Sequence, residues 1–112
     1  MRKDDAIRLR HMVDAAEEAI SFASDRKRED LDLDRMLALS LVKEIEIIGE
    51  AASKVADACR TAHPEIPWPS IVTMHHRLIH GYFNINLDIV WATVTEELPP
   101  LVINLKVALA TP

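Results

Sequence analysis

Apolar residues recur every three or four positions along most of this chain, a spacing that predicts amphipathic helices. The first predicted helix covers about residues 5–24, where one apolar stripe faces away from a polar side. The second covers about residues 34–60 and has the nearly unbroken three-four repeat that is typical of a bundle seam. Its apolar surface is wider than one stripe. We therefore expect this helix to contact several neighbours, including a second copy of the chain in a homodimer.

Prolines separate the second predicted helix from the third. The segment 61–69 contains three prolines, so the second helix cannot continue through it. Pro69 suits the first turn of a third helix, because the N–H that proline lacks has no helical partner there. This third helix is expected over about residues 68–79, and Gly81 would end it.

The fourth predicted helix contains two adjacent prolines, Pro99 and Pro100, and either Asn84 or Asn86 would cap its N-terminus. The prolines remove two backbone donors and should kink or split the helix. Together, the four segments predict an all-α fold, an up-and-down four-helix bundle with a kinked last helix. The 112 residues suffice for one domain over 1–112, and only two glycines are present, which disfavours a turn-rich β fold.

Composition narrows the possible classes of function. The formal net charge of −5 argues against a protein that coats nucleic acid, although a local basic cleft remains compatible with it. The single cysteine, Cys59, excludes an internal disulfide and fits a reducing compartment. No apolar run approaches the ~20 residues of a membrane span, and the N-terminus lacks the apolar core of a signal peptide. We expect a cytoplasmic protein that does not contact membranes.

Candidate chemistry concentrates in residues 74–83, which combine three histidines with an arginine and a tyrosine. In RNA cleavage, a base takes the proton of a ribose 2′-OH, which then attacks the adjacent phosphate, and a cation stabilises the added negative charge. We expect His80 to be the base and Arg77 the cation, because imidazole moves protons near neutral pH and guanidinium binds phosphate. His76 should lie one helical turn before His80 on the same face. No metal or other cofactor is required. The candidate supporting residues are His76, Glu46 and Glu50.

A purely structural interpretation of the same cluster remains open. In it, the third helix has a partly buried end at which His80 bonds to a carbonyl group. Arg77 would then form an ion pair with Glu46 or Glu50 of the second helix. Ion-pair networks of this kind are common in proteins without any catalytic role.

A zinc site is a further alternative. His76 and His80 have the i,i+4 spacing of helical zinc ligands, and His75 or His63 would add a third. However, Arg77 directly follows the first of these ligands, and its positive charge opposes a bound dication. We therefore expect no metal.

Motifs in several parts of the chain resemble one protein family. They are Glu46-Ile47-Ile48-Gly49-Glu50-Ala51, Pro67-Trp68, Arg77-Leu78-Ile79-His80-Gly81-Tyr82-Phe83, Leu87-Asp88-Ile89-Val90-Trp91 and Leu98-Pro99-Pro100-Leu101. In this combination, and over nearly its whole length, the chain is similar to the HepT-like (DUF86) family of the HEPN helical ribonucleases. The resemblance implies the toxin of a toxin–antitoxin pair, a homodimeric and metal-independent endoribonuclease. We further expect the two copies of residues 75–82 to line one shared cleft.

The resemblance also implies a partner and a modification. The partner is a minimal nucleotidyltransferase (MNT) antitoxin, which blocks the toxin by transferring AMP to a tyrosine, here Tyr82. The family pattern is an arginine, four to six residues, a histidine, any residue and a tyrosine. His80 and Tyr82 match it, but His75 stands where the arginine is expected.

This departure from the pattern leaves the activity open. His75 could act as the cation when protonated, Arg77 could swing into the arginine's place, or the protein could be a weakened or inactive toxin. The alternative function is therefore a non-catalytic helical dimer that binds the nucleotidyltransferase and is AMPylated by it.

Overall fold

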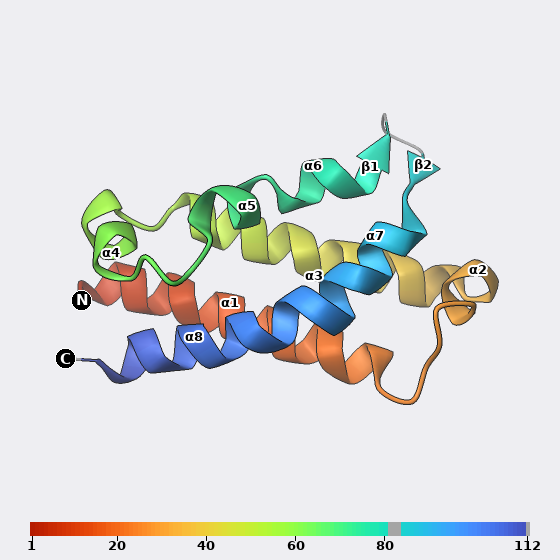
Figure 1. Cartoon of the computed structure of the whole chain (residues 1–112), viewed down its shortest axis with the longest axis horizontal. Helices are drawn as coiled ribbons and strands as arrows, with labels where there is room; N and C mark the ends of the chain where they lie inside the picture. The colour runs from red at the N-terminus through yellow and green to blue at the C-terminus, as the bar shows by residue number, and fades with distance from the viewer. Residues whose placement is uncertain (81–83, 112) are drawn as a thin grey trace.

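Four antiparallel layers of helix form an up-and-down bundle in the computed structural model, with both chain termini at the same end (Figure 1). The structure describes residues 1–80 and 84–111, with His80 described by its backbone alone. The all-α prediction is confirmed, since the only described strands have two residues each. The layers are, in order, α1 (Lys3–Ala23); α3 (Arg35–Ser53); α5 (Trp68–Val72) with α6 (Met74–Leu78); and α7 (Leu87–Ala92), the π-helical turn η1 (Thr93–Glu97) and α8 (Leu98–Ala110). The smaller elements are α2 (Asp30–Leu33), α4 (Asp57–Ala62), β1 (Ile79–His80) and β2 (Asn84–Ile85).

Side-chain caps set where two of the helices begin. The carboxylate of Asp34 accepts a hydrogen bond from the backbone N–H of Leu37 at 3.0 Å, in the first turn of α3. That bond, aided by Arg26, lowers the pKa of Asp34. The side chain of Asn86, one of the two capping residues that the sequence predicted, accepts a bond from the N–H of Ile89 at 3.2 Å and starts α7.

The second predicted helix is shorter than expected. It was predicted over 34–60, but α3 ends at Ser53 and the chain turns before α4 begins. Contacts from elsewhere stabilise this break: the carboxylate of Asp5 in α1 accepts a bond from the N–H of Ala56 at 3.0 Å. The guanidinium of Arg60 donates to the carbonyl oxygens of Ala52 and Val55, at 2.9 and 3.1 Å, just where α3 ends.

The third predicted helix is also divided, and this changes the candidate site. It breaks at Thr73 and ends at Leu78, and the chain then pairs as β1 with β2. The expectation that His80 shares a helical face with His76 is therefore wrong. The physical reason is the hairpin: Ile79 pairs with Ile85 in an antiparallel ladder, and the N–H of Asn86 donates to the carbonyl of Leu78 at 2.6 Å. The expected end at Gly81 lies outside the described residues.

The interruption predicted for the fourth helix is present. Pro99 and Pro100 lie in the first turn of α8, where no N–H is available for the carbonyls of Thr95 and Glu96. The preceding residues form the wider π-helical turn η1, so the layer consists of α7, η1 and α8.

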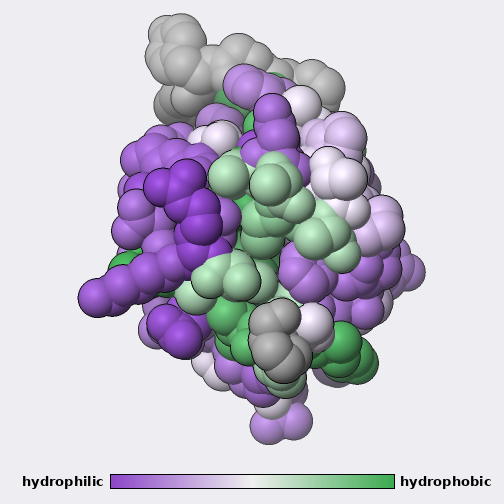
Figure 2. Space-filling model, turned by 90° about the vertical axis from the view of Figure 1, so that its left-hand side faces the viewer, coloured by the Kyte–Doolittle hydropathy of each residue, from purple (hydrophilic) through white to green (hydrophobic). Residues whose placement is uncertain are grey.

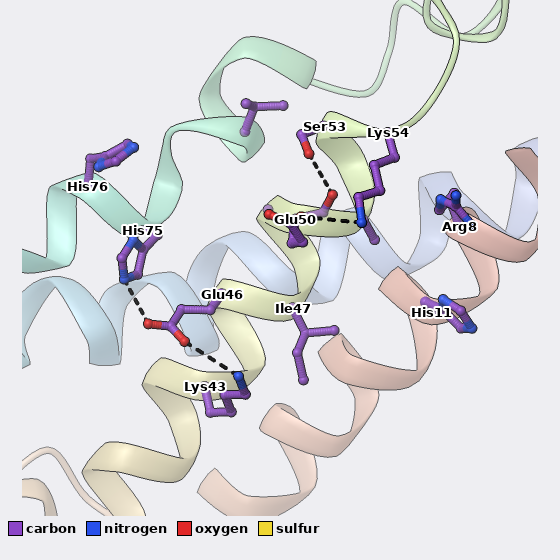
Figure 3. Close-up of a pocket in the computed structure, with 13 residues that line it drawn as sticks. Arg8, His11, Lys43, Glu46, Ile47, Glu50, Ser53, Lys54, His75 and His76 are labelled. Carbon is purple, nitrogen blue, oxygen red and sulfur yellow. Dashed lines mark hydrogen bonds and ion pairs between the residues drawn. The ribbon is translucent and has the colours of Figure 1, made fainter.

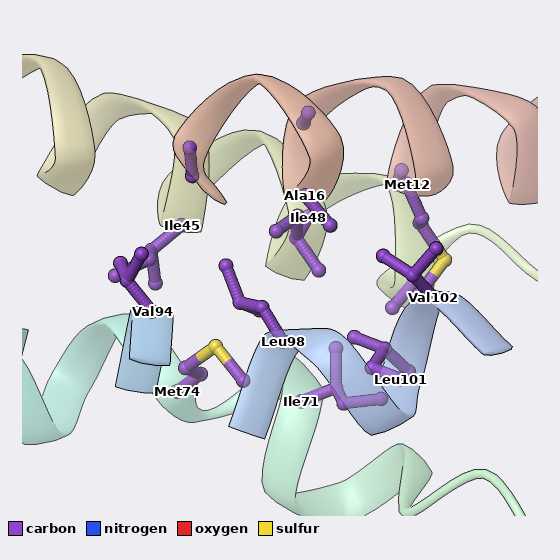
Figure 4. Close-up of a cluster of buried hydrophobic side chains, with 14 of the residues drawn as sticks. Met12, Ala16, Ile45, Ile48, Ile71, Met74, Val94, Leu98, Leu101 and Val102 are labelled. Atoms are coloured by element: carbon purple, nitrogen blue, oxygen red, sulfur yellow. The ribbon is translucent and has the colours of Figure 1, made fainter. Parts of the chain in front are cut away.

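The core lies between the four layers and consists almost entirely of aliphatic side chains (Figure 4). Met12 of α1, Ile48 of α3 and Leu98 of α8 are buried to 2% exposure or less. Burying one such side chain contributes about 1.5–3 kcal/mol relative to leaving it exposed. Cys59 and Trp68 also belong to the core. Burial raises the pKa of the Cys59 thiol, which fits an unreactive core residue.

The surface is not uniformly polar. Seen from the end that holds both termini, a central apolar strip runs between hydrophilic borders (Figure 2). Toward the opposite end, Leu33 and Met36 expose 85% and 81% of their surface. Within residues 1–80 and 84–111, no helix has both the length and the apolarity needed to cross a membrane.

Candidate active site

A groove of about 680 Å³ runs along the outward face of α3, between α1 on one side and α5 and α6 on the other (Figure 3). Its floor is the middle and end of α3. It brings together side chains that are up to 68 positions apart in the sequence, from Arg8 to His76. The groove-lining residues are Arg8, His11, Lys43, Glu46, Ile47, Gly49, Glu50, Ala51, Ser53, Lys54, Val72, His75 and His76.

Gly49 explains how α3 forms so close a floor. A Cβ atom at this position would lie 3.2 Å from the carbonyl oxygen of Ile71 and 3.6 Å from that of Val72. Both oxygens belong to the backbone of α5, which cannot move aside as a flexible side chain can. Glycine therefore permits α5 to approach α3, and this approach places the following helix, α6, with its histidines at the groove.

His75 and Glu46 form the central contact of the groove. Nε2 of His75 lies 2.8 Å from Oε1 of Glu46, at ion-pair distance but without the alignment of a hydrogen bond. The contact is an ion pair when the imidazole is protonated. The other carboxylate oxygen of Glu46 lies 3.8 Å from Nζ of Lys43. Glu46 therefore connects the candidate cation His75 to a lysine on the floor, and the side chains of His75 and Glu46 are each about one-third exposed.

The ion-pair partner of Arg77 in the structure is neither of the two glutamates that the sequence predicted. The structural interpretation paired it with Glu46 or Glu50, but Nη2 of Arg77 lies 3.3 Å from Oε1 of Glu97 in η1. The π-helical turn at η1 brings this carboxylate opposite α6. Glu50 instead pairs with Lys54 at 3.4 Å, one helical turn further along α3. Exposed pairs of this kind contribute about 0–1 kcal/mol, so a phosphate can displace Glu97 from Arg77 at little cost.

The remaining predicted residues follow α6. His76 is exposed, with its ring edge-on to that of His75 at a centroid distance of 5.7 Å. The backbone of His80 pairs with Asn84 in the hairpin, two residues beyond the end of α6. The side chain of His80, and all of Tyr82, lie outside the described residues. Their assignments as general base and AMP acceptor therefore stay predictions.

Two groove residues come from α1, which sequence reasoning did not connect to the cluster. Arg8 and His11 lie three apart on the non-apolar side of α1 and reach the groove opposite His75 and His76. Nε of Arg8 is buried and has no hydrogen-bond partner among the residues that the structure describes. The only sign in the sequence that they share a site is their spacing of three positions on the polar face of α1.

The charges of the groove suit an anionic ligand in spite of the acidic chain. Arg8, Lys43 and Lys54 outnumber the two glutamates, and each glutamate already has a basic neighbour. Three histidines add charge when protonated. Among the described side chains, no three histidine, cysteine or acidic residues lie close enough to hold a metal ion. The arrangement can bind phosphate and, with a base nearby, support proton transfer.

Comparison with known proteins points to one family. The family model described as ribonuclease HepT-like matches residues 12–108. A Thermococcus cleftensis protein named "Probable ribonuclease HepT" is 33% identical over 93 residues, which cover 83% of this chain and 84% of that protein. A candidate RNase from Caldanaerobacter subterraneus subsp. tengcongensis is 36% identical over 93 residues, 83% of each chain. A third relative, a candidate RNase of Methanocaldococcus jannaschii, is 29% identical over 83% of this chain and 85% of its own length.

No solved structure matches the chain significantly.

Proposed function

Because the chain belongs to the HepT-like family, we propose that it is a metal-independent endoribonuclease that binds RNA along the α3 groove. The observation that carries the proposal is the placement of His75 and Glu46 in a groove with surplus basic charge, next to the segment that leads to His80. The names of the relatives support ribonuclease activity, and the groove offers a place for the phosphate backbone.

In the proposed reaction, His80 accepts the proton of a ribose 2′-OH. The oxygen O2′ forms a bond to phosphorus while the bond from phosphorus to O5′ breaks, which leaves a 2′,3′-cyclic phosphate and a 5′-hydroxyl. Water supplies the proton that O5′ needs, and the proton on His80 returns to solvent. A cation must stabilise the charge that develops on the phosphate oxygens. Arg77 and His75 are the two candidates, both on α6.

The structure favours Arg77 as the more available cation. Its contact with Glu97 is exposed and weak, so the guanidinium can turn toward a phosphate. His75 faces Glu46 at 2.8 Å and offers one further ring nitrogen to a ligand. We therefore assign Arg77 to stabilising the transition state, and His75, held by Glu46, to a second and weaker contact with the same phosphate.

The proposal includes two partners. The chain acts as a homodimer in which the two copies of residues 75–82 line a shared cleft, and it is the toxin of a pair with a minimal nucleotidyltransferase antitoxin. The antitoxin transfers AMP to Tyr82, which places a negative phosphate beside Arg77 and the histidines, where it competes with RNA. Both statements rest on the family.

One observation favours the alternative function, a non-catalytic dimer that binds the nucleotidyltransferase. Both candidate cations face carboxylates, His75 with Glu46 and Arg77 with Glu97. If neither contact opens, neither candidate cation can reach the RNA phosphate, and the protein binds its partner without cleaving RNA.

An RNA cleavage assay separates the two functions. The purified protein should cleave single-stranded RNA in the presence of EDTA, and His80→Ala should abolish cleavage. His63→Ala is the matched control, since His63 lies outside the groove and contacts Glu65 at 3.6 Å. Cleavage that survives in His80→Ala would reject His80 as the base. An inactive wild-type protein that still binds the nucleotidyltransferase would establish the alternative.

A further inference from the structure

A second hollow, of about 350 Å³, lies beside the groove on the same side of α3. Lys43 borders both cavities, so the hollow and the groove belong to one continuous face. Its walls come from α1 and from the first half of α3. The hollow-lining residues are Glu18, Phe22, Leu39, Ser40, Lys43 and Glu44.

Two carboxyl groups, those of Glu18 and Glu44, line this hollow, and neither forms an ion pair among the described residues. Glu44 is only 5% exposed, and its Oε2 atom is buried and has no hydrogen-bond partner among the described residues. Glu18 of α1 lines the same hollow, and its carboxylate opposes ionisation of Glu44. Lys43, which also lines the hollow, lies 3.8 Å from Glu46 instead. A buried carboxylate without a counter-charge is costly, so this pair takes up either a proton or a positive group.

The rim of the hollow is apolar and open. Phe22 and Leu39 expose 39% and 45% of their surface, and Met36 projects from the same helix one turn before Ser40. When a lysine or arginine enters a protein interface, its aliphatic chain packs on apolar side chains and its charged group needs an anionic partner. The rim and the carboxyl pair offer both.

We propose that this face binds a second copy of the chain, and that Lys43 of each copy enters the Glu18–Glu44 hollow of the other. The proposal rests on the homodimer of the proposed function and names the surface and the ion pair that would form it. The charges support it: one face carries both the uncompensated carboxyl pair and a lysine whose side chain is 70% exposed. In a two-fold interface the same patch contacts itself, so these opposite charges can pair twice.

This interface would also complete the groove. Because Lys43 stands between the two cavities, a partner seated on the hollow lies next to the groove of the first copy. The two grooves then meet near the two-fold axis and can form one longer site for RNA.

Association should depend on pH through the carboxyl pair. Burial and the neighbouring Glu18 raise the pKa of Glu44 to about 7, so in the isolated chain this carboxyl group holds a proton below pH 7 and loses it above. The charged groups facing Glu44 are Glu18 from α1 and Lys43 from α3. Entry of the partner's lysine displaces the proton, so the dimer should become tighter as the pH rises through 7. With one proton released at each of two sites, the dissociation constant should fall about tenfold or more between pH 6 and pH 8.

The test is sedimentation equilibrium over a dilution series at pH 8, with circular dichroism to confirm folding. Lys43→Glu and Glu18→Lys should each weaken the dimer by about tenfold or more, since each places like charges opposite one another. An equimolar mixture of the two variants should restore association, because each of its two contacts again joins opposite charges. Lys106→Glu is the matched control: it reverses an exposed lysine of α8 and should leave the dimer unchanged.

Three further results are informative. Glu44→Gln should remove the pH dependence and hold the dimer at its weaker, low-pH affinity. If both charge reversals leave a wild-type dimer intact, the interface lies elsewhere and this inference is overturned, while the homodimer stands. If the wild-type chain is a monomer at micromolar concentration, the proposed homodimer itself is wrong.

Discussion

Replacing His75 with arginine should raise the rate of RNA cleavage. Nε2 of His75 faces Glu46 at 2.8 Å, which leaves the imidazole one ring nitrogen for a phosphate. A guanidinium has five N–H donors and a permanent charge, so it can contact Glu46 and still present donors to the substrate. A charged contact to the transition state is typically worth ~3 kcal/mol, or about a hundredfold in rate. His75 is one-third exposed, and solvent weakens the contact, so we expect a gain of about tenfold.

The assay compares initial rates of cleavage of one fluorescent RNA by wild type and His75→Arg at pH 7.5. His76→Arg is the matched control, because it adds the same group at the exposed neighbouring position and should raise the rate less. Equal rates for wild type and His75→Arg, both abolished by His80→Ala, would refute the reasoning. They would show that Arg77, released from Glu97, stabilises the transition state alone and that position 75 does not contact the reacting phosphate.

Three other predictions concern stability and modification. The pKa of Glu44 is raised from 4.5 to about 7 in the folded monomer, so the folded chain holds a proton that the unfolded chain loses near pH 4.5. The free energy of unfolding of the monomer should therefore fall as the pH rises from 4.5 to 7. In urea titrations at dilutions that keep the chain monomeric, Glu44→Gln should remove this fall, and an unchanged slope would contradict the burial argument. Gly49→Ala should destabilise the fold by about 1 kcal/mol in spite of the better helix former, because its Cβ meets the backbone of α5 at 3.2 Å. Ser53→Ala, on the same helix, is the control, and a stabilised Gly49→Ala variant would show that α5 yields easily. Co-expression with an active cognate nucleotidyltransferase should add AMP to the peptide containing Tyr82, as seen by mass spectrometry, and Tyr82→Phe should abolish it. An unmodified wild-type peptide would count against the mechanism.

The sequence predicts those parts of the fold that local chemistry determines. The apolar repeat locates the four layers, Asn86 caps α7, and the proline pair interrupts the last helix. The break after α3 could not be predicted in this way. It depends on Asp5, 51 positions away from Ala56, while the apolar repeat continues through the break without interruption.

The candidate site shows the same limit. The cluster on α6 is visible in the sequence, because three histidines and an arginine stand together. Its surroundings are not: Glu97 reaches Arg77 through a π-helical turn, and Arg8 reaches the groove only through the packing of α1 on α3. Helical spacing also placed His80 on the face of His76, whereas backbone pairing with Asn84 removes it from the helix.

The most direct test of the central claim is the chemistry of the cleaved ends. Purified wild-type protein, incubated with a defined single-stranded RNA in EDTA, should produce fragments that end in a 2′,3′-cyclic phosphate and begin with a 5′-hydroxyl. These ends follow from attack by the 2′-OH with His80 as the base. Fragments with 5′-phosphates, cleavage that requires a divalent metal, or no cleavage above that of His80→Ala would contradict the account.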